Sequence, residues 1–375
     1  MGIVQSFQNW LGGSWPGWAA YLVAALVGAI VLSLIVILLV MAFAYMERRV
    51  IGRFQIRLGP NRTGPQGTLQ LVADAIKMLL KEDIVPSRGD RLMHALAPVI
   101  SFMPALLVFA VIPFQSGVYL VDLNVGILYV VAIGTVSMMG VFMAGWSSNN
   151  KYSLLAAMRA VAQMVSYELP LVLSIIGVLL ISGSLSLVKI VEAQSIPFIL
   201  LQPLGFLIFF IGASAELNRS PFDLLEAESE IVSGYHTEYS GMKFGLFLLG
   251  EYGHALGASA IMTTLFLGGW RWALLPGWLW FLVKVVGVYT LLIWTRATLP
   301  RFRVDQLMGF AWKALFPMAL LNMFITGAEV LWAEQMGWSV LPWPFLIVNF
   351  AVAGVLIVLW SRFFKTGGGR VEVRA

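Results

Sequence analysis

Nine apolar segments, each close to the length of chain that crosses a lipid bilayer, recur from one end of the sequence to the other. They cover residues 21–46, 94–115, 125–146, 161–183, 197–216, 243–267, 279–295, 314–331 and 343–361. A helix needs about 20 apolar residues to span the hydrocarbon core. Only 11% of the 375 residues are charged, against roughly 25% in soluble domains. The sequence therefore predicts an all-α polytopic membrane protein with about nine transmembrane helices, in a single transmembrane domain of residues 1–375.

The distribution of basic residues predicts how these helices are oriented. Of 24 Lys and Arg residues, 21 fall in loops or in the tail on one side of the predicted bundle, and such loops remain cytoplasmic. Residues 1–20 are then external, whereas the loops 48–92 and 217–242 and the tail 365–375 are cytoplasmic. Ten tryptophans lie at the predicted outer interface, and the membrane–water interface favours amphipathic side chains such as indole. They are Trp10, Trp15, Trp18, Trp270, Trp272, Trp278, Trp280, Trp332, Trp338 and Trp343. We expect a multi-pass protein of the bacterial inner membrane.

Cysteine is absent from the sequence, so the chain can form no disulfide and can offer no thiolate to a metal ion or an iron–sulfur cluster. We expect no metal site and no redox centre in this chain, which assigns any redox centre to a partner. The first twenty residues hold no Lys or Arg, unlike a secretory signal peptide, so the first helix is expected to be retained. The net charge of +5 comes from basic residues in the loops on one side of the predicted bundle, so it does not indicate a nucleic-acid partner.

The first cytoplasmic loop contains a segment with one polar face. Between residues 67 and 82, Gln70, Asp74, Lys77 and Lys81 follow one another at intervals of four, three and four residues. Most of the other positions are apolar, a pattern typical of an amphipathic helix that lies at the membrane surface.

Six ionisable residues fall within the predicted spans, where burying a charge is costly. They are Glu47, Glu168, Glu216, Glu251, Lys284 and Glu329. Glu47 adjoins two arginines at the end of its span, so an interfacial ion pair and a functional role are both open. Lys284 can extend its ammonium group toward the interface, and Glu329 lies near the outer surface, so a structural role is favoured for both.

Glu168 and Glu251 lie deeper in their predicted spans. Glu168 comes shortly before Pro170, and a proline inside a helix frees a backbone carbonyl that can accept polar partners. Glu251 precedes His254 by three residues, which places both on one helical face. Carboxylates in apolar surroundings hold protons more tightly and can carry them near neutral pH. A satisfied hydrogen bond in the interior is the structural alternative for each.

The loop that follows the fifth predicted span is strongly acidic. Six carboxylates occur within 23 residues: Glu216, Asp223, Glu226, Glu228, Glu230 and Glu238. In a helix, Asp223, Glu226 and Glu230 would share one face, whereas Glu228 would point elsewhere. Charges that close together cannot all ionise cheaply, so their proton affinities should be coupled. Apolar residues interleave the acids, which a fully solvated loop would not require.

Several motifs, spread over nearly the whole chain, resemble one family of complex I membrane subunits, the family that includes the first mitochondrially encoded membrane subunit. They are Glu47-Arg-Arg-Val-Ile-Gly-Arg-Phe-Gln-Ile-Arg57 with Gly59-Pro-Asn-Arg-Thr-Gly-Pro65, Ala73-Asp-Ala-Ile-Lys77, Lys81-Glu-Asp83, Ser166-Tyr-Glu-Leu169, the acidic loop, and Arg296-Ala-Thr-Leu-Pro-Arg-Phe-Arg-Val-Asp-Gln306. The resemblance implies a membrane component of a proton-translocating NADH:quinone oxidoreductase, whose cytoplasmic loops help enclose a quinone chamber.

The resemblance also implies roles for individual residues. Quinone contacts are implied for Glu47, Arg48, Arg57, Lys77, Phe222, Glu226, Glu228 and Arg296. Proton coupling is implied for Glu168, Glu216, Asp223, Glu226, Glu228, Glu230 and Glu251, with Glu238 in the same loop. Some family members place a further Glu where this sequence has Thr135, so that position cannot be an obligatory proton carrier here.

The family further implies the partners and cofactors. Quinone, either ubiquinone or menaquinone, is the substrate, and this chain alone is expected to bind no other cofactor. NADH, FMN and iron–sulfur clusters belong to partner subunits. The expected partners are the quinone-site subunits of the peripheral arm, the small membrane subunits beside the antiporter-like subunits, and the lipid bilayer.

Three other functions are compatible with a membrane protein of this kind. A stand-alone proton or ion transporter would use the buried acids directly, and the isolated chain would then be active in liposomes. The equivalent anchor subunit of a ferredoxin-linked or hydrogenase complex would differ in its neighbouring genes and copurifying subunits, and residues 59–65 fit the respiratory version better. A structural scaffold would leave the buried acids without a role.

Overall fold

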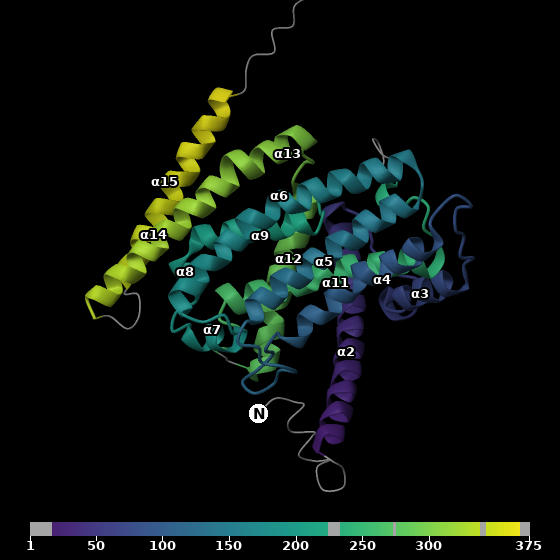
Figure 1. The fold of residues 1–375 in the computed structure, drawn as a ribbon, viewed down its shortest axis with the longest axis horizontal. Coiled ribbons are helices and arrows are strands. Elements are labelled where there is room, and N and C mark those ends of the chain that lie inside the picture. Colours follow the sequence, from purple (N-terminus) through teal and green to yellow (C-terminus); the bar gives the residue numbers. More distant parts are fainter. Residues whose placement is uncertain (1–16, 224–232, 273–274, 338–342, 368–375) are drawn as a thin grey trace, which may run out of the picture.

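The computed structural model describes residues 17–223, 233–272, 275–337 and 343–367 of the chain (Figure 1). In this part of the chain the regular structure is helical and no strand occurs. The predicted all-α class is therefore confirmed. Several predictions concern residues outside the described ranges, namely the first part of the external terminus, Trp10, Trp15, Trp338, Glu226, Glu228, Glu230 and most of the tail.

Each of the nine apolar segments contains a helix. The helices are α2 (Gly17–Phe54), α4 (Arg91–Leu107), α5 (Gly126–Ser147), α6 (Lys151–Ser182), α9 (Pro203–Glu216), α11 (Gly241–Phe266), α12 (Gly277–Thr298), α14 (Phe316–Gln335) and α15 (Trp343–Gly367). Six stretches of the described chain are long and apolar enough to cross a membrane: α2, α4 with η2 (Val108–Ala110), α5, α6, α12, and residues 304–335. The count of nine spans remains a prediction, because the apolar stretches of α9 and α15 are shorter and α11 falls outside these six by its composition.

One spanning stretch and one further predicted span depart from a single regular helix. Residues 304–335 consist of α13 (Val304–Phe310), a π-helical turn η4 (Ala311–Leu315) and α14. The segment expected at 197–216 is interrupted at Gln202, where α8 (Phe198–Leu201) ends and α9 begins at Pro203. A proline at the first position of a helix is favourable because its missing N–H would have no partner there, which explains why the second helix begins at Pro203.

Side-chain caps and a left-handed glycine determine where several helices begin and end. Asp90 caps α4 by accepting hydrogen bonds from the N–H groups of Leu92 and Met93, and Asn150 caps α6 in the same manner. Helix α6 ends at Gly183, whose φ of 63° is accessible at low cost to glycine. The turn that Asn150 caps joins α5 to α6, and these two helices pack against each other.

The first loop contains η1 (Pro65–Gly67) and α3 (Gln70–Leu80). The predicted amphipathic helix is thus present, although it begins at Gln70 rather than at residue 67. Its polar residue Asp74 faces Arg48 of α2, whereas Val72, Ile76, Leu79 and Leu80 are exposed. An exposed apolar helix face beside spanning helices is suited to contact with lipid.

The bundle is built around α11. It packs against α4, α12 and α2, and it also contacts the short helix α7 (Leu187–Ala193). Helices α14 and α15 lie side by side along one edge, and α2 projects from the opposite part of the bundle (Figure 1). The main apolar core joins residues of α2, α6, α9, α11 and α12, and this packing fixes the helices that carry the buried acids.

Candidate functional site: an ion-pair cluster beside an acidic cavity

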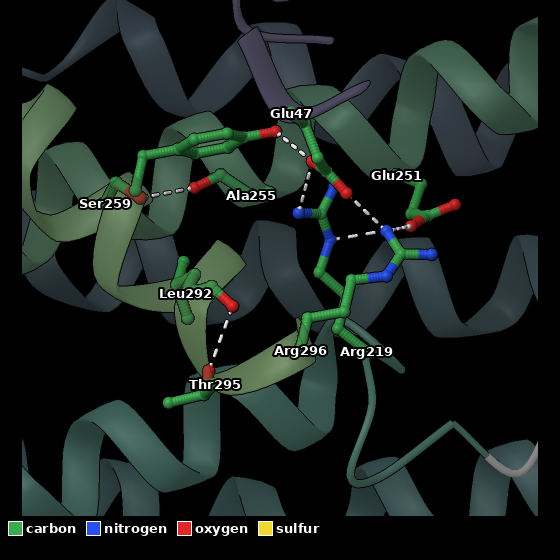
Figure 2. A network of polar contacts seen from close by, with 9 residues as sticks. Glu47, Arg219, Glu251, Ala255, Ser259, Leu292, Thr295 and Arg296 are labelled. Carbon is green, nitrogen blue, oxygen red and sulfur yellow. Dashed lines mark hydrogen bonds and ion pairs between the residues drawn. The ribbon is translucent and has the colours of Figure 1, made fainter. Parts of the chain in front are cut away.

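Four charged side chains from distant parts of the sequence meet at one end of α2 (Figure 2). Glu47 of α2 is almost fully buried, with 1% of its side chain exposed. Arg219, in the loop after α9, places its Nη1 atom 2.8 Å from Glu47 Oε2. Arg296 of α12 pairs with the other carboxylate oxygen of Glu47. The Tyr289 hydroxyl donates a hydrogen bond of 2.7 Å to Glu47 Oε2.

Glu251 of α11 completes this cluster on its other side. Its Oε1 atom lies 3.5 Å from Arg219 Nε and 3.9 Å from Arg296 Nη1. The cluster formed by Glu47, Arg219, Glu251 and Arg296 therefore holds two acids and two bases. Balanced charges and close hydrogen bonds offset the large cost of removing ions from water, so the four groups stabilise one another.

Arg219 is the most deeply buried base of the cluster. Its side chain is 2% exposed, and its guanidinium lies over the rings of Tyr252 and Tyr289, 5.3 and 5.5 Å from their centroids. Burial alone would lower the pKa of Arg219, but Tyr289, Glu47 and Glu251 raise it above its ordinary value. Arg219 is therefore a permanent positive charge between two carboxylates.

Beside the cluster is a cavity of about 130 Å³, which is room for several water molecules. It is lined by Glu168 of α6, Glu216 at the end of α9 and Glu251 of α11, and by His254 and Ser137. Glu251 thus belongs both to the cavity and to the cluster. The structure brings together three acids that the sequence had placed only on separate helices.

Two residues that line the cavity, Glu168 and His254, have hydrogen-bond partners that hold them in place. The hydroxyl of Thr135 donates a 2.6 Å hydrogen bond directly to Glu168 Oε1. His254 Nε2 lies 3.1 Å from the carbonyl oxygen of Ser101. The Thr135 hydroxyl cannot take up or release a proton near neutral pH, but it contacts the Glu168 carboxylate, which can.

The other basic residues implied in quinone contacts lie apart from the cluster. Arg48 Nη1 is 2.6 Å from Asp74 Oδ2 and joins α2 to α3. Partial burial would raise the pKa of Asp74, but the hydrogen bonds from Arg48 and Gln70 lower it. Lys77 and Arg57 are exposed, and Arg57 Nε donates to Gln55 Oε1 at 2.7 Å. Of the residues implied in quinone contacts, Glu47 and Arg296 therefore lie in the cluster beside Glu251. Arg57 and Lys77 do not.

The described ends of the acidic loop are tied to neighbouring helices. Asp223 Oδ2 lies 2.9 Å from Arg301 Nη2, and Glu238 Oε1 accepts a 2.8 Å hydrogen bond from Asn150 Nδ2. Phe222 is 4% exposed and packs against the rings of Tyr167 and Phe302. Glu226, Glu228 and Glu230 lie outside the described residues, so their predicted shared face stays a prediction.

Reasoning from the sequence missed three residues of this site. Arg219 was counted only as a basic residue at the edge of a loop. Tyr289 precedes Arg296 by seven residues, a helical spacing that places both on one face and could have linked them. Gln163 donates 2.8 Å hydrogen bonds from Nε2 to the carbonyls of Ala215 and Phe222, a loop-holding role for which no sequence signal exists.

Lys284 and Glu329 lie away from the cluster and the cavity. Lys284 Nζ donates to the carbonyls of Leu267 at 2.7 Å, Gly269 at 2.8 Å and Arg271 at 3.1 Å. These carbonyls belong to the turn that follows α11, where a positive charge is favourable because it lies near the C-terminal end of the helix. Glu329 accepts a 3.0 Å hydrogen bond from Asn349. The contacts of Lys284 agree with the structural role favoured for it.

Acid pH should loosen the loop that precedes α11. His236 of η3 (Gly234–His236) is buried beside the rings of Tyr235 and Phe244, and this burial lowers its pKa from 6.5 to about 4. Because the folded pKa lies below the unfolded one, the loop keeps its full stability above pH 6.5 and loses about 3 kcal/mol as the pH falls toward 4.

Hydrogen exchange of the backbone amides of residues 234–240, corrected for the intrinsic pH dependence, measures this change. A His236→Phe variant, which cannot be protonated, should keep its protection between pH 6.5 and 4. Equal losses of protection in both proteins would show that His236 is not the cause.

Comparisons with known proteins show which family the chain belongs to. The sequence model of the NADH dehydrogenase family matches residues 27–327. The H subunit of the NADH-quinone oxidoreductase of Dehalococcoides mccartyi (strain CBDB1) is 58% identical over 349 residues, which cover 93% of this chain and 98% of that protein. The proteins of the same name from Geobacillus kaustophilus and Brevibacillus brevis are 49% and 48% identical, over 87% and 86% of this chain and 99% and 97% of their own lengths. The chain therefore belongs to the NADH dehydrogenase family.

Proposed function

We propose that this chain is the membrane subunit of a proton-translocating NADH:quinone oxidoreductase, and that it forms part of the quinone chamber and passes the effect of quinone reduction to a row of carboxylates. Relatives of 48–58% identity over most of the chain are named as the H subunit of NADH-quinone oxidoreductase. Their name supports a membrane subunit of the complex I type. The chamber and the proton coupling rest on the geometry of the chain itself.

The observation that carries the proposal is the position of Glu251, which belongs both to the ion-pair cluster and to the wall of the cavity. This carboxylate faces Arg219 and Arg296 on one side and lines the cavity with Glu168 and Glu216 on the other. A change of charge near the cluster therefore alters the electrostatic environment of the first acid of the cavity. Through Glu251, a change of charge on quinone reduction in the chamber can alter the protonation of the acids inside the membrane domain.

The quinone would approach this cluster from the membrane surface. The Arg48–Asp74 ion pair joins α2 to α3, and the exposed apolar face of α3 is suited to a lipid-soluble substrate. Arg48 follows Glu47 in α2 but points about 100° away from it around the helix, so a headgroup would pass Arg48 before it reached the cluster. Quinone-site subunits of the peripheral arm would close the chamber above it.

Reduction of the quinone then changes the local charge. Two electrons supplied by a partner's iron–sulfur centre and two protons convert a quinone to a quinol. The residues of this chain contribute proton donors and a charge-sensitive loop, anchored at Asp223 by Arg301 and at Phe222 by Gln163. Withdrawal of protons near the loop biases the protonation of Glu251, Glu216 and Glu168, and this shift drives proton transfer elsewhere in the complex.

Replacing Glu216 by Gln in the assembled enzyme should lower both quinone reduction and proton translocation, because an amide of nearly the same shape fills the cavity wall but cannot carry a proton. Glu228→Gln should have the same effect through the loop. Both activities are measured in proteoliposomes with NADH and a soluble quinone. Glu192→Gln, a change at an exposed position of α7, serves as the control. Unchanged turnover and pumping in both variants would count against the proposal.

A further inference from the structure

Of the three histidines of the chain, one lines the acidic cavity, namely His254 of α11. It lies three residues after Glu251, so the two side chains share one face of the helix. The proton coupling proposed above involves the carboxylates of the cavity and not His254. An imidazole is nevertheless the side chain best suited to exchange protons near neutral pH.

A hydrogen bond shows which ring nitrogen of His254 carries the proton. Nε2 lies 3.1 Å from the carbonyl oxygen of Ser101 in α4. A carbonyl oxygen can only accept a hydrogen bond, so Nε2 is the donor and Nδ1 of the neutral ring is an acceptor. Among the described residues Nδ1 has no hydrogen-bond partner, and this atom keeps accessible surface. Nδ1 can therefore gain and lose a proton while Nε2 stays bonded to Ser101.

The carboxylates of the cavity fall into two groups. Glu168 of α6 accepts a hydrogen bond from a side chain of α5. Glu216 lies against the same turn of α5, because a Cβ atom built on Gly134 would be 3.2 Å from its Oε1 atom. Glu251 is carried by α11, the helix that also carries His254. Two acids therefore lie beside α5, whereas one acid and one imidazole line the cavity from α11.

The cavity has room for the water that would join these groups. Its volume is about 130 Å³, which holds several water molecules. Along α11, His254 lies about 4.5 Å beyond Glu251, at 1.5 Å per residue. The residues of α11 that line the cavity after His254 are Gly257, Ala258 and Ile261, none of which can carry a proton. His254 is therefore the last group on this helix that can exchange a proton with water in the cavity.

From this geometry we infer that His254 is a proton-transfer residue of the acidic cavity, an inference that rests on the proton coupling proposed above. Nδ1 takes a proton from water next to Glu251, so that an N–H bond forms as an O–H bond breaks. It then releases this proton through water to Glu168 or Glu216, and the neutral ring returns. Because the Nε2 bond to Ser101 persists in both charge states, the ring need not turn between the two steps.

Two replacements of His254 separate proton transfer from the hydrogen bond to Ser101. In His254→Gln the amide can still donate to the Ser101 carbonyl but cannot take up a proton, whereas His254→Leu loses both functions. Quinone turnover and proton translocation of the assembled enzyme in proteoliposomes should fall by about tenfold in both variants. Turnover and pumping of His254→Gln close to those of the unmodified enzyme would overturn the inference, because the hydrogen bond alone would then suffice.

Ser259→Ala is the matched control on the same helix. Ser259 is buried, its hydroxyl donates to the Ala255 carbonyl of α11, and it is not part of the cavity wall, so both activities should be unchanged. An equal loss in Ser259→Ala would overturn the inference, because any polar change in α11 would then have the same effect. Glu251→Gln, measured alongside, separates the two proposals. A loss in Glu251→Gln but not in His254→Gln would remove His254 alone, and no loss in either would also count against the proposed coupling.

A second measurement does not depend on any variant folding. A map of the unmodified complex that resolves ordered water should show density within hydrogen-bond distance of His254 Nδ1, connected directly or through further water to Glu251 and to Glu168 or Glu216. Nδ1 packed against apolar side chains, with no water beside it, would contradict the inference.

Discussion

Replacement of Arg219 by Met should destabilise the region around the end of α2 by about 3–5 kcal/mol, the usual cost of removing one partner from a buried ion pair. Two carboxylates, Glu47 and Glu251, would then share the single cation of Arg296. Methionine matches the length of the arginine stem, so the packing against Tyr252 and Tyr289 is largely kept and the loss reports mainly the missing charge.

Hydrogen exchange in the intact complex measures this loss locally. Amides at the end of α2 and in the loop after α9 should exchange roughly a hundredfold faster, or more, if they open together. Arg301→Met is the matched control, because the Arg301–Asp223 pair borders the same loop but Arg301 is 39% exposed. An exposed pair contributes about 0–1 kcal/mol.

The double replacement Arg219→Met with Glu47→Leu separates the charge from the packing. It removes one acid and one base together, so much of the lost stability should return. Equal exchange rates in Arg219→Met and Arg301→Met would contradict the buried cluster, as would a double variant that is less stable than either single one.

Glu251→Gln should have the largest effect on activity of any single change in the cavity. Among the described residues, this one alone contacts the arginines of the cluster and also lines the cavity together with Glu168 and Glu216. Loss of a positioned group that donates or accepts a proton lowers the rate of the dependent step by about 10²-fold or more. NADH:quinone turnover in proteoliposomes should fall by that order.

Two controls make this result specific. NADH oxidation with a soluble dye as electron acceptor bypasses the quinone and should be unchanged, which shows that the peripheral arm is intact. Glu334→Gln, at an exposed position on α14, should leave quinone reduction as it was. Quinone turnover in Glu251→Gln within twofold of the unmodified enzyme would mean that no obligatory proton passes through this carboxylate.

The sequence predicted the helices well because hydrophobic length and composition carry that signal. Each apolar segment contains a helix, and Asp90, Asn150 and Gly183 terminate helices as their residue types favour. The interruption at Gln202 was not predicted. A proline was visible at 203, but the buried partner of Gln202 comes from Thr326, more than a hundred residues later.

The individual acids of the site were predictable, but their arrangement was not. Glu47, Glu168, Glu216 and Glu251 stood out because charge inside an apolar span is costly. Which of them meet depends on how α2, α6, α9, α11 and α12 pack, and spacing within one helix cannot reveal that. Arg219 illustrates the limit, because its place in a loop gave no sign that it would be buried between two carboxylates.

The most direct test of the proposed chamber is a structure of the intact complex with a quinone-site inhibitor bound. Arg48, Phe222 and Glu226 should contact the inhibitor, and its headgroup should lie next to the cluster of Glu47, Arg219, Glu251 and Arg296. An inhibitor that binds without touching this chain, or that touches only the lipid-facing side of α15, would contradict the account.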